Sequence, residues 1–294
     1  MNVRVNPDGN VGAARDTSPV VTPALHFLGH STVRVEIAGR TVLTDPVLTR
    51  RIGPLRRVVP VPDPDTWADV DLVLISHLHG DHLHLPSLRL LGTDTRIVVP
   101  RGAGDWLRRR GFAHVAEIGA GETLSDGDLR ITGVRAEHSG HRFGPRLTHG
   151  PDTEAVGHLL EGGGSTVYVS GDTALHDSMP LLGDRAVDVA LLPVWGWGPN
   201  LGPGHLDPVE AAEAVALIRP RIAVPVHWGT LTVPGIGPRS PLGARMRRLL
   251  VEPPRRFAAA VAERALATTV LVTEPGASVA LPSFARPAPA LGAA

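Results

Sequence analysis

The chain has 294 residues and no cysteine, and this absence narrows both its chemistry and its setting. Without thiols it forms no disulfides, offers no thiolate metal ligands and has no cysteine nucleophile. A protein of this length buries roughly three quarters of its unfolded surface, so its core can stabilise it without cross-links. The lack of disulfides fits a reducing cytosol, and we expect a cytoplasmic protein.

An excess of charge and long apolar runs are also absent. The 29 basic and 29 acidic residues cancel, which is atypical of a nucleic-acid-binding protein. Lysine is missing too, and we attribute the abundance of arginine to genomic base composition. No run of 18 apolar residues occurs, and residues 1–20 lack the apolar core of a signal peptide. We therefore expect no nucleic-acid partner and no integral membrane segment.

The first half of the chain is rich in segments that predict strands. Apolar and β-branched runs occupy 24–29, 32–39, 40–46, 70–77, 95–100, 114–119, 122–138 and 154–172. The turns "SDGD" and "EGGGS" and the pair Ala38-Gly39 predict hairpins between some of them. Short helices are predicted over 86–91 and 102–111, and a loop rich in arginine and proline covers 47–65.

The second half alternates strands and helices. Strands are predicted over 187–194, 221–229 and 277–281, and helices over 207–220 and 253–267. Asp207 is the predicted N-cap of the helix that starts at Pro208 and stops at Pro220. We predict one α/β domain over 21–282, with two sheets face to face and helices outside. Residues 1–20 are predicted to be a disordered N-terminal segment, and 283–294 a C-terminal tail.

Histidines are concentrated in "SHLHGDHLH", residues 76–84, which hold four of the 14 in the chain and follow an apolar strand. Zinc-type ions bind imidazole nitrogens and carboxylate oxygens. His77 and His79 point to the same side of an extended chain and can meet one ion. Gly80 lets the chain turn, so that Asp81 and His82 can face a second ion. The stretch therefore predicts half of a two-ion site of the kind that clamps hydrolytic reactions.

Other polar residues at predicted strand ends can complete such a site. His138 follows the strand that ends in "VRAE", Asp172 follows "VYVSG", and His227 ends "IAVPV". Each alone is more typical of a polar strand cap than of a ligand. Together with the histidine stretch they supply two coordination shells, with Asp172 as the bridging carboxylate.

The ordered motifs "SHLHGDH", "AEH", "SGD" and "PVHWG" resemble the metallo-β-lactamase superfamily, and the resemblance extends from residue 24 to 282. It implies a four-layer αβ/βα sandwich of two mixed sheets flanked by helices. It assigns His77, His79 and His138 to one metal ion and Asp81, His82 and His227 to the other, with Asp172 bridging. "FLGHSTVRVEIAGRTVLTDPVLTRR" and "GPGHLDPVEAAEA" are similar to the branch of N-acyl-phosphatidylethanolamine phospholipase D and ascorbate-phosphate-lactonase-like proteins. His84 departs from that branch, where an acidic residue is frequent.

The resemblance also suggests roles for residues around the ligands. Asp45 would orient a ligand histidine through its other ring nitrogen, although it could simply initiate the turn at Pro46. His205 would contact substrate and donate a proton. Further candidates for substrate binding, each weighed against a structural or solvated role, are His30, Arg50, Arg51, His141, Trp195 and Trp197. The basic loop Arg50–Arg57 could meet a phosphate or a lipid.

These residues predict a metal-dependent hydrolase that uses a metal-bridging hydroxide, with Asp81 and His205 as catalytic groups. Two divalent ions are expected, zinc first, with manganese or iron compatible. The expected small-molecule substrate is a phosphodiester or a phosphorylated, lipid-like compound. Lactonase or amidase activity is the first alternative. Nuclease activity, iron-dependent oxygen chemistry and a non-catalytic metal-binding module also stay open, as does the oligomeric state, a homo-oligomer included.

Overall fold

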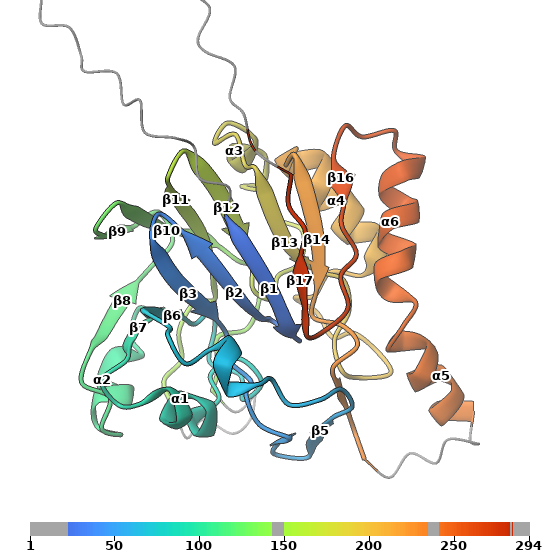
Figure 1. Cartoon of the computed structure of the whole chain (residues 1–294). Coiled ribbons are helices and arrows are strands. Elements are labelled where there is room, and N and C mark those ends of the chain that lie inside the picture. The colour runs from blue at the N-terminus through green and yellow to red at the C-terminus, as the bar shows by residue number, and fades with distance from the viewer. Residues whose placement is uncertain (1–22, 143–149, 235–240, 283, 285–294) are drawn as a thin grey trace, which may run out of the picture.

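The computed structural model describes residues 23–142, 150–234, 241–282 and 284, so the predicted N-terminal segment lies outside it. Two seven-stranded sheets form the centre of the molecule (Figure 1). In order across the first sheet lie β17 (Ala277–Val279), β1 (Ala24–Gly29), β2 (Thr32–Ile37), β3 (Arg40–Thr44), β6 (Leu72–Leu74), β7 (Arg96–Pro100) and β8 (Val115–Ile118). In order across the second lie β16 (Thr269–Val270), β14 (Ile222–Val226), β13 (Val189–Pro193), β12 (Ser165–Val169), β11 (Val156–Gly162), β10 (Leu129–Arg135) and β9 (Thr123–Asp126).

Both sheets are mixed in the same way. Strands β1 to β3 are antiparallel and β3, β6, β7 and β8 are parallel. Likewise β9 to β12 are antiparallel and β12, β13, β14 and β16 are parallel. Central parallel strands such as β13 are buried along their whole length, which explains their uninterrupted apolar sequences.

Helices cover the outer faces of the two sheets. On the first sheet, α1 (Leu85–Leu91) and α2 (Gly104–Arg108) enclose a core that includes Val73, Val99 and Leu107. On the second, α3 (Pro180–Gly183), α4 (Pro208–Ile218) and α6 (Pro253–Glu263) pack against the strands (Figure 1). The predicted sandwich of two sheets flanked by helices is confirmed. None of the helices in the described ranges is long and apolar enough to cross a membrane.

Several elements differ from the sequence-based expectation. The strand predicted over 70–77 is only Leu72–Leu74, because the chain leaves the sheet before the histidine stretch. The short strands β4 (Arg51–Ile52), β5 (Leu55–Arg57) and β15 (Leu231–Thr232) form a small third sheet. These strands, and helix α5 (Pro241–Leu249), were not predicted. Strands of two or three residues are too short to show a period. Phe284, within the predicted tail, is 1% exposed and packs in the main core.

Helix α4 has the predicted N-terminal signal in full. The Asp207 carboxylate accepts hydrogen bonds from the backbone N–H groups of Val209 and Glu210, and Glu210 accepts one from the Asp207 N–H. Such a capping box satisfies donors that the helix itself leaves unpaired. The helix ends at Arg219, whose left-handed backbone (φ 54°) precedes Pro220.

Replacing Asp207 with alanine is expected to lower the free energy of unfolding by about 1 kcal/mol, because two backbone donors lose their acceptor. Urea denaturation of the metal-free protein measures this value. Glu213→Ala is the matched control, because Glu213 is exposed in the middle of the same helix and makes no contact with the cap. Equal losses in the two variants would contradict the capping role.

Candidate metal centre

The predicted ligands come together at one edge of the sandwich, beyond the carboxyl ends of similarly directed strands. The histidine stretch, residues 76–84 and hereafter the histidine loop, follows β6 of the first sheet. His138, Asp172 and His227 follow β10, β12 and β14 of the second sheet. Ligand sites of open α/β sheets lie beyond the carboxyl ends of the strands, where polar side chains from separate strands meet. All seven predicted ligands are therefore contributed from four separate segments.

Three histidines form a first cluster. His77 Nε2 and His138 Nε2 lie 3.0 Å and 3.1 Å from His79 Nδ1. Burial lowers the pKa of all three, to about 4 for His79 and well below the usual value for His77. Neutral imidazoles with converging ring nitrogens are the form in which histidine binds a metal ion.

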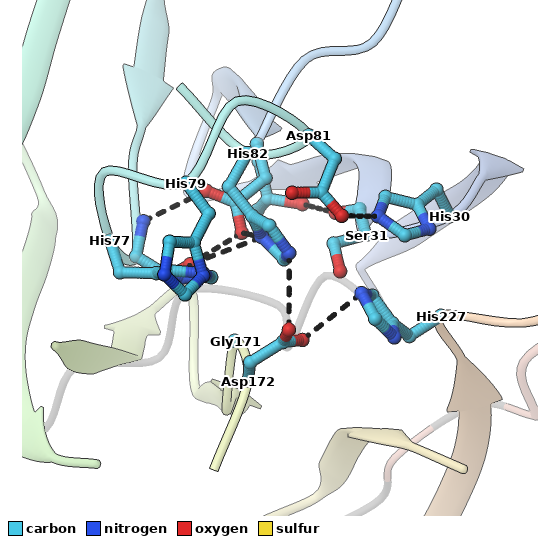
Figure 2. Close-up of polar contacts among 12 residues, drawn as sticks. His30, Ser31, His77, His79, Asp81, His82, Gly171, Asp172 and His227 are labelled. Carbon is cyan, nitrogen blue, oxygen red and sulfur yellow. Dashed lines mark hydrogen bonds and ion pairs between the residues drawn. The ribbon is translucent and has the colours of Figure 1, made fainter. Parts of the chain in front are cut away.

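Asp172 lies at the centre of the second group (Figure 2). Its Oδ2 is 3.3 Å from His82 Nε2 and its Oδ1 is 3.2 Å from His227 Nε2. Burial alone would raise the pKa of Asp172, but His227 and His82 outweigh it and hold that pKa well below its ordinary value. Asp172 is therefore an ionised carboxylate placed between histidines from different sheets.

Four of the histidines form a hydrogen bond through Nδ1, which orients their Nε2 atoms toward the centre of the cluster. The acceptors are Ser76 Oγ for His77, Asp45 Oδ2 for His82, the Gly204 carbonyl for His138 and the Trp195 carbonyl for His227. A proton held on Nδ1 leaves the Nε2 lone pair available, which is the usual arrangement of metal-binding histidines. Asp45 thus contacts His82 in the way predicted, at 2.8 Å.

Polar atoms at the centre are buried without hydrogen-bond partners. They are His82 Nε2, His227 Nε2 and Asp172 Oδ1, which converge from three segments; the nitrogens lie at ion-pair distance from Asp172, but none of the three atoms makes a hydrogen bond. A buried polar atom left unpaired costs roughly 1–3 kcal/mol, so native structures seldom retain such a group without a ligand to satisfy it. Imidazole nitrogens and a carboxylate are the donors preferred by zinc and tolerated by manganese and iron. The donor set therefore fits divalent metal ions.

Backbone strain is concentrated at the same place. His30, Asp45 and His227 have positive φ angles of 55°, 37° and 64°. A left-handed backbone costs a non-glycine residue of the order of 1–3 kcal/mol and persists where the surroundings enforce it. Three such residues lie around one cluster, where strained backbone is typical of functional sites.

Residues 40–228 match the family described as "Beta-lactamase superfamily domain". The chain belongs to the beta-lactamase superfamily. A UPF0173 metal-dependent hydrolase of Methanopyrus kandleri is 33% identical over 255 residues, which cover 86% of this chain and 97% of that protein. Within the superfamily the chain therefore groups with the UPF0173 metal-dependent hydrolases.

Solved structures show the same superfamily fold. Igni18, a metallo hydrolase from Ignicoccus hospitalis, is 24% identical with a TM-score of 0.66 and covers 88% of this chain and 98% of its own. CmlA, a diiron beta-hydroxylase from Streptomyces venezuelae, is 22% identical with a TM-score of 0.58 and covers 84% of this chain and 52% of its own. At these identities the likeness concerns the fold alone, and one fold supports different reactions.

In this superfamily member a cavity of about 690 Å³ opens beside the predicted metal-ligand residues. His79, Asp81, Asp172 and His205 face it from the centre. The β4–β5 hairpin forms one wall of the cavity, and the histidine loop with Pro86 on α1 forms another. Arg142 and Trp197 complete the lining from two further segments. The wall residues are Ile52, Gly53, Pro54, Leu55, Gly80, His84, Pro86, Arg142 and Trp197. The candidate site is thus an apolar cleft with ionisable groups at its base.

The two tryptophans predicted near the cleft have different positions. Trp197 is 37% exposed, lines the cavity and donates from Nε1 to Asp81 Oδ2 at 3.0 Å. Trp195 instead packs against the main core and donates to the Gly198 carbonyl. Trp197 is therefore the tryptophan available to a substrate.

Other predicted substrate contacts lie away from the cleft. His30 is 1% exposed and donates from behind to Asp81 Oδ2 at 3.0 Å, so it contacts a predicted ligand and not the cavity. Arg50, just before the hairpin, and Arg51, at the start of β4, are exposed and are not among the residues that line the cavity. His141 pairs with Asp152 at 3.0 Å and faces a neighbouring hollow.

Sequence reasoning missed Arg142 and the apolar wall of Ile52 and Leu55. A basic residue four positions after His138 was the available signal for Arg142. For the wall, the signal was a pair of apolar residues inside the arginine-rich loop. Neither signal is specific, because both depend on how distant segments meet.

Replacing Asp45 with asparagine is expected to lower zinc affinity about 10- to 100-fold, the usual loss when a residue that orients a ligand is changed. Asparagine tolerates the left-handed backbone, but it lacks the charge that faces His82 Nδ1. Competition with a chromophoric chelator measures the affinity. Asp71→Asn is the control, because this carboxylate accepts from the Thr41 N–H on the same sheet and touches no histidine. Unchanged affinity in Asp45→Asn would contradict the orienting role.

Proposed function

We propose that this chain is a binuclear metal-dependent hydrolase that acts on phosphodiester or phosphorylated, lipid-like small molecules. The observation that carries the proposal is the convergence of His82 Nε2, His227 Nε2 and Asp172 Oδ1, which are buried at ion-pair distance around Asp172 and make no hydrogen bond. Membership of a family whose relatives are named metal-dependent hydrolases supports it. A bound cation would satisfy these buried polar atoms.

Two sets of residues would hold the ions. His77, His79 and His138 would bind one and Asp81, His82 and His227 the other, with Asp172 shared between them. When bound, two divalent ions lower the pKa of a water molecule and polarise a substrate oxygen. We expect zinc, because imidazoles and carboxylates suit it, and the same donors accept manganese or iron.

Asp81 would orient the attacking water. Its Oδ2 is held by His30 and Trp197, each at 3.0 Å, so the carboxylate has little freedom to rotate. Burial alone would raise the pKa of Asp81, but the hydrogen bond from His30 and the neighbouring His82 hold it well below the ordinary value. A carboxylate that stays ionised and fixed at the base of the cleft can accept a hydrogen bond from water.

His205 would donate a proton to the leaving group. It lines the cavity, and its Nε2 lies 3.4 Å from Asp172 Oδ2. Burial lowers the pKa of His205, but the interaction with Asp172 outweighs it, so the net shift is upward. An imidazole whose proton is stabilised near neutral pH suits a general acid.

The surroundings of the cleft favour an anionic substrate with an apolar part. The β4–β5 hairpin carries exposed Arg51 and Arg56, and Arg50 directly precedes it; these side chains attract negative charge. The hairpin and Trp197 offer an apolar wall for the organic part of the substrate. The resemblance to phospholipase D-like members points to the same class.

Elemental analysis together with hydrolysis assays tests this function. We expect two metal ions per chain after supplementation, and hydrolysis of bis(p-nitrophenyl) phosphate that is lost in Asp172→Asn. Fewer than one ion per chain would overturn the binuclear assignment. Hydrolysis of a lactone panel without hydrolysis of the phosphodiester would assign the lactonase alternative instead.

A further inference from the structure

We propose that Arg142 is a positioning residue that holds the histidine loop in the geometry needed for metal binding. The proposal rests on the proposed function, because it concerns the same ligands. Arg142 belongs to neither ligand set. It acts through the backbone of the loop that supplies four of the seven predicted ligands, His77, His79, Asp81 and His82.

The guanidinium of Arg142 binds the histidine loop at two points. Its Nη1 donates to the Leu78 carbonyl at 2.8 Å and to the Leu83 carbonyl at 2.6 Å. Leu78 lies between His77 and His79, and Leu83 directly follows His82. The first bond restrains the Leu78–His79 peptide group, next to a predicted ligand, and the second restrains the Leu83–His84 peptide group, one residue beyond His82.

The loop's own hydrogen bonds restrain a different part of it. The N–H groups of His82 and Leu83 both donate to the His79 carbonyl, at 3.1 Å and 2.9 Å, and close the turn around Gly80. They fix the turn but do not attach it to the rest of the protein. Asp45 and His30 attach the loop through the side chains of His82 and Asp81. Arg142, 64 and 59 residues away from Leu78 and Leu83, attaches it through the backbone on both sides of the turn.

Arg142 is itself held by its surroundings. Its guanidinium carbon lies 5.2 Å from the centre of the Trp106 ring on α2, within the range of a cation–π contact. Its stem passes so close to Gly150 that a Cβ there would lie 2.5 Å from Arg142 Cβ. These contacts limit the conformations of the Arg142 side chain, so its hydrogen bonds hold the loop in a fixed position relative to α2.

The position of Arg142 in the chain adds a second link. It lies four residues after His138, and His138 joins His77 and His79 in the first cluster. The three histidines of that cluster come only from the histidine loop and from the segment that carries Arg142. One side chain thus ties together the two segments that would bind one ion.

Zinc affinity of the full-length Arg142→Met variant tests the proposal. Methionine keeps an apolar stem and removes the guanidinium, so the two carbonyls lose their donor. We expect the affinity for at least one zinc ion to fall about 10- to 100-fold, as for other residues that support metal ligands. The visible spectrum of the cobalt-loaded protein should change as well, since it reports ligand geometry at the ion.

Arg110→Met is the matched control. Arg110 stacks on the same Trp106 ring at 3.6 Å but donates to the Trp106 carbonyl, away from the loop. We expect its zinc affinity and cobalt spectrum to match the wild type, although its stability falls. A general loss of packing around Trp106 would affect both variants alike and would overturn the proposal.

Two further outcomes separate this proposal from the proposed function. A wild-type chain that binds no zinc or cobalt overturns both. A wild-type chain that binds two ions, with unchanged affinity in Arg142→Met, overturns the positioning role alone. Should the methionine variant not fold, Arg142→Gln decides, because a shorter, uncharged amide cannot place a donor between the Leu78 and Leu83 carbonyls as Nη1 does. Wild-type affinity and spectrum in Arg142→Gln then overturn the proposal, and a loss of affinity supports it.

Discussion

Replacing Asp172 with asparagine is expected to lower zinc affinity by more than about 100-fold, a greater loss than that from residues that only support ligands. Asp172 lies 3.2–3.4 Å from nitrogens of His82, His205 and His227. Within the described residues it is the sole carboxylate that lies close to histidines of both predicted ligand groups, for example His82 and His138. Asparagine has the same shape but no charge, so neither ion keeps its shared anionic ligand. Chelator competition and elemental analysis measure the loss.

Asp188→Asn separates this effect from the general cost of changing a buried carboxylate. Asp188 is 2% exposed and accepts from the Thr166 N–H at the start of β12, at the far end of the strand from Asp172. We expect Asp188→Asn to lose stability and to keep its zinc affinity. Affinity in Asp172→Asn within tenfold of the wild type would refute the bridging role.

Replacing Gly171 with alanine is expected to lower the free energy of unfolding by about 2–5 kcal/mol, the sum of left-handed strain and overpacking. Gly171 has φ of 63°, and a Cβ at this position would lie 2.4 Å from Ser76 Cβ. The substitution forces the Asp172 segment away from the histidine loop, so zinc affinity should fall as well. Denaturation in the presence of a chelator measures the stability without a contribution from bound metal.

Gly39→Ala is the matched control for the strain alone. Gly39 has a similar φ of 69° in the β2–β3 turn, and nothing lies within 4 Å of a Cβ placed there. Its alanine variant should lose only about 1–2 kcal/mol. If the two variants lose the same stability, the close approach of Gly171 to Ser76 is not what limits this position.

The convergence of the predicted ligand segments could be anticipated because each is a polar group after an apolar strand. His77, Asp172 and His227 all follow buried runs, and parallel strands bring their carboxyl ends to one edge. The spacing within the histidine loop and the superfamily resemblance then gave the predicted set of seven metal ligands. The layered fold followed from the same alternation of strands and helices.

The environment of the ligands could not be predicted in the same way. His30 looked like a cleft residue, and only the folded chain shows that it lies buried against Asp81, 51 residues away. Arg142 reaches the histidine loop across about sixty residues, and no spacing rule covers such a contact. The apolar wall depends on strands of two or three residues, which are too short for a periodic pattern.

The two sheets each contribute predicted ligands from their own strand ends, and this arrangement has a consequence for the whole molecule. His77, His79, Asp81 and His82 belong to the first sheet, whereas His138, Asp172 and His227 belong to the second. Ions bound among them would join the two halves of the sandwich at its open edge. In a chain without cysteine, the metal centre would then serve as an inorganic cross-link, and metal supply would govern the cohesion of the fold as well as its chemistry.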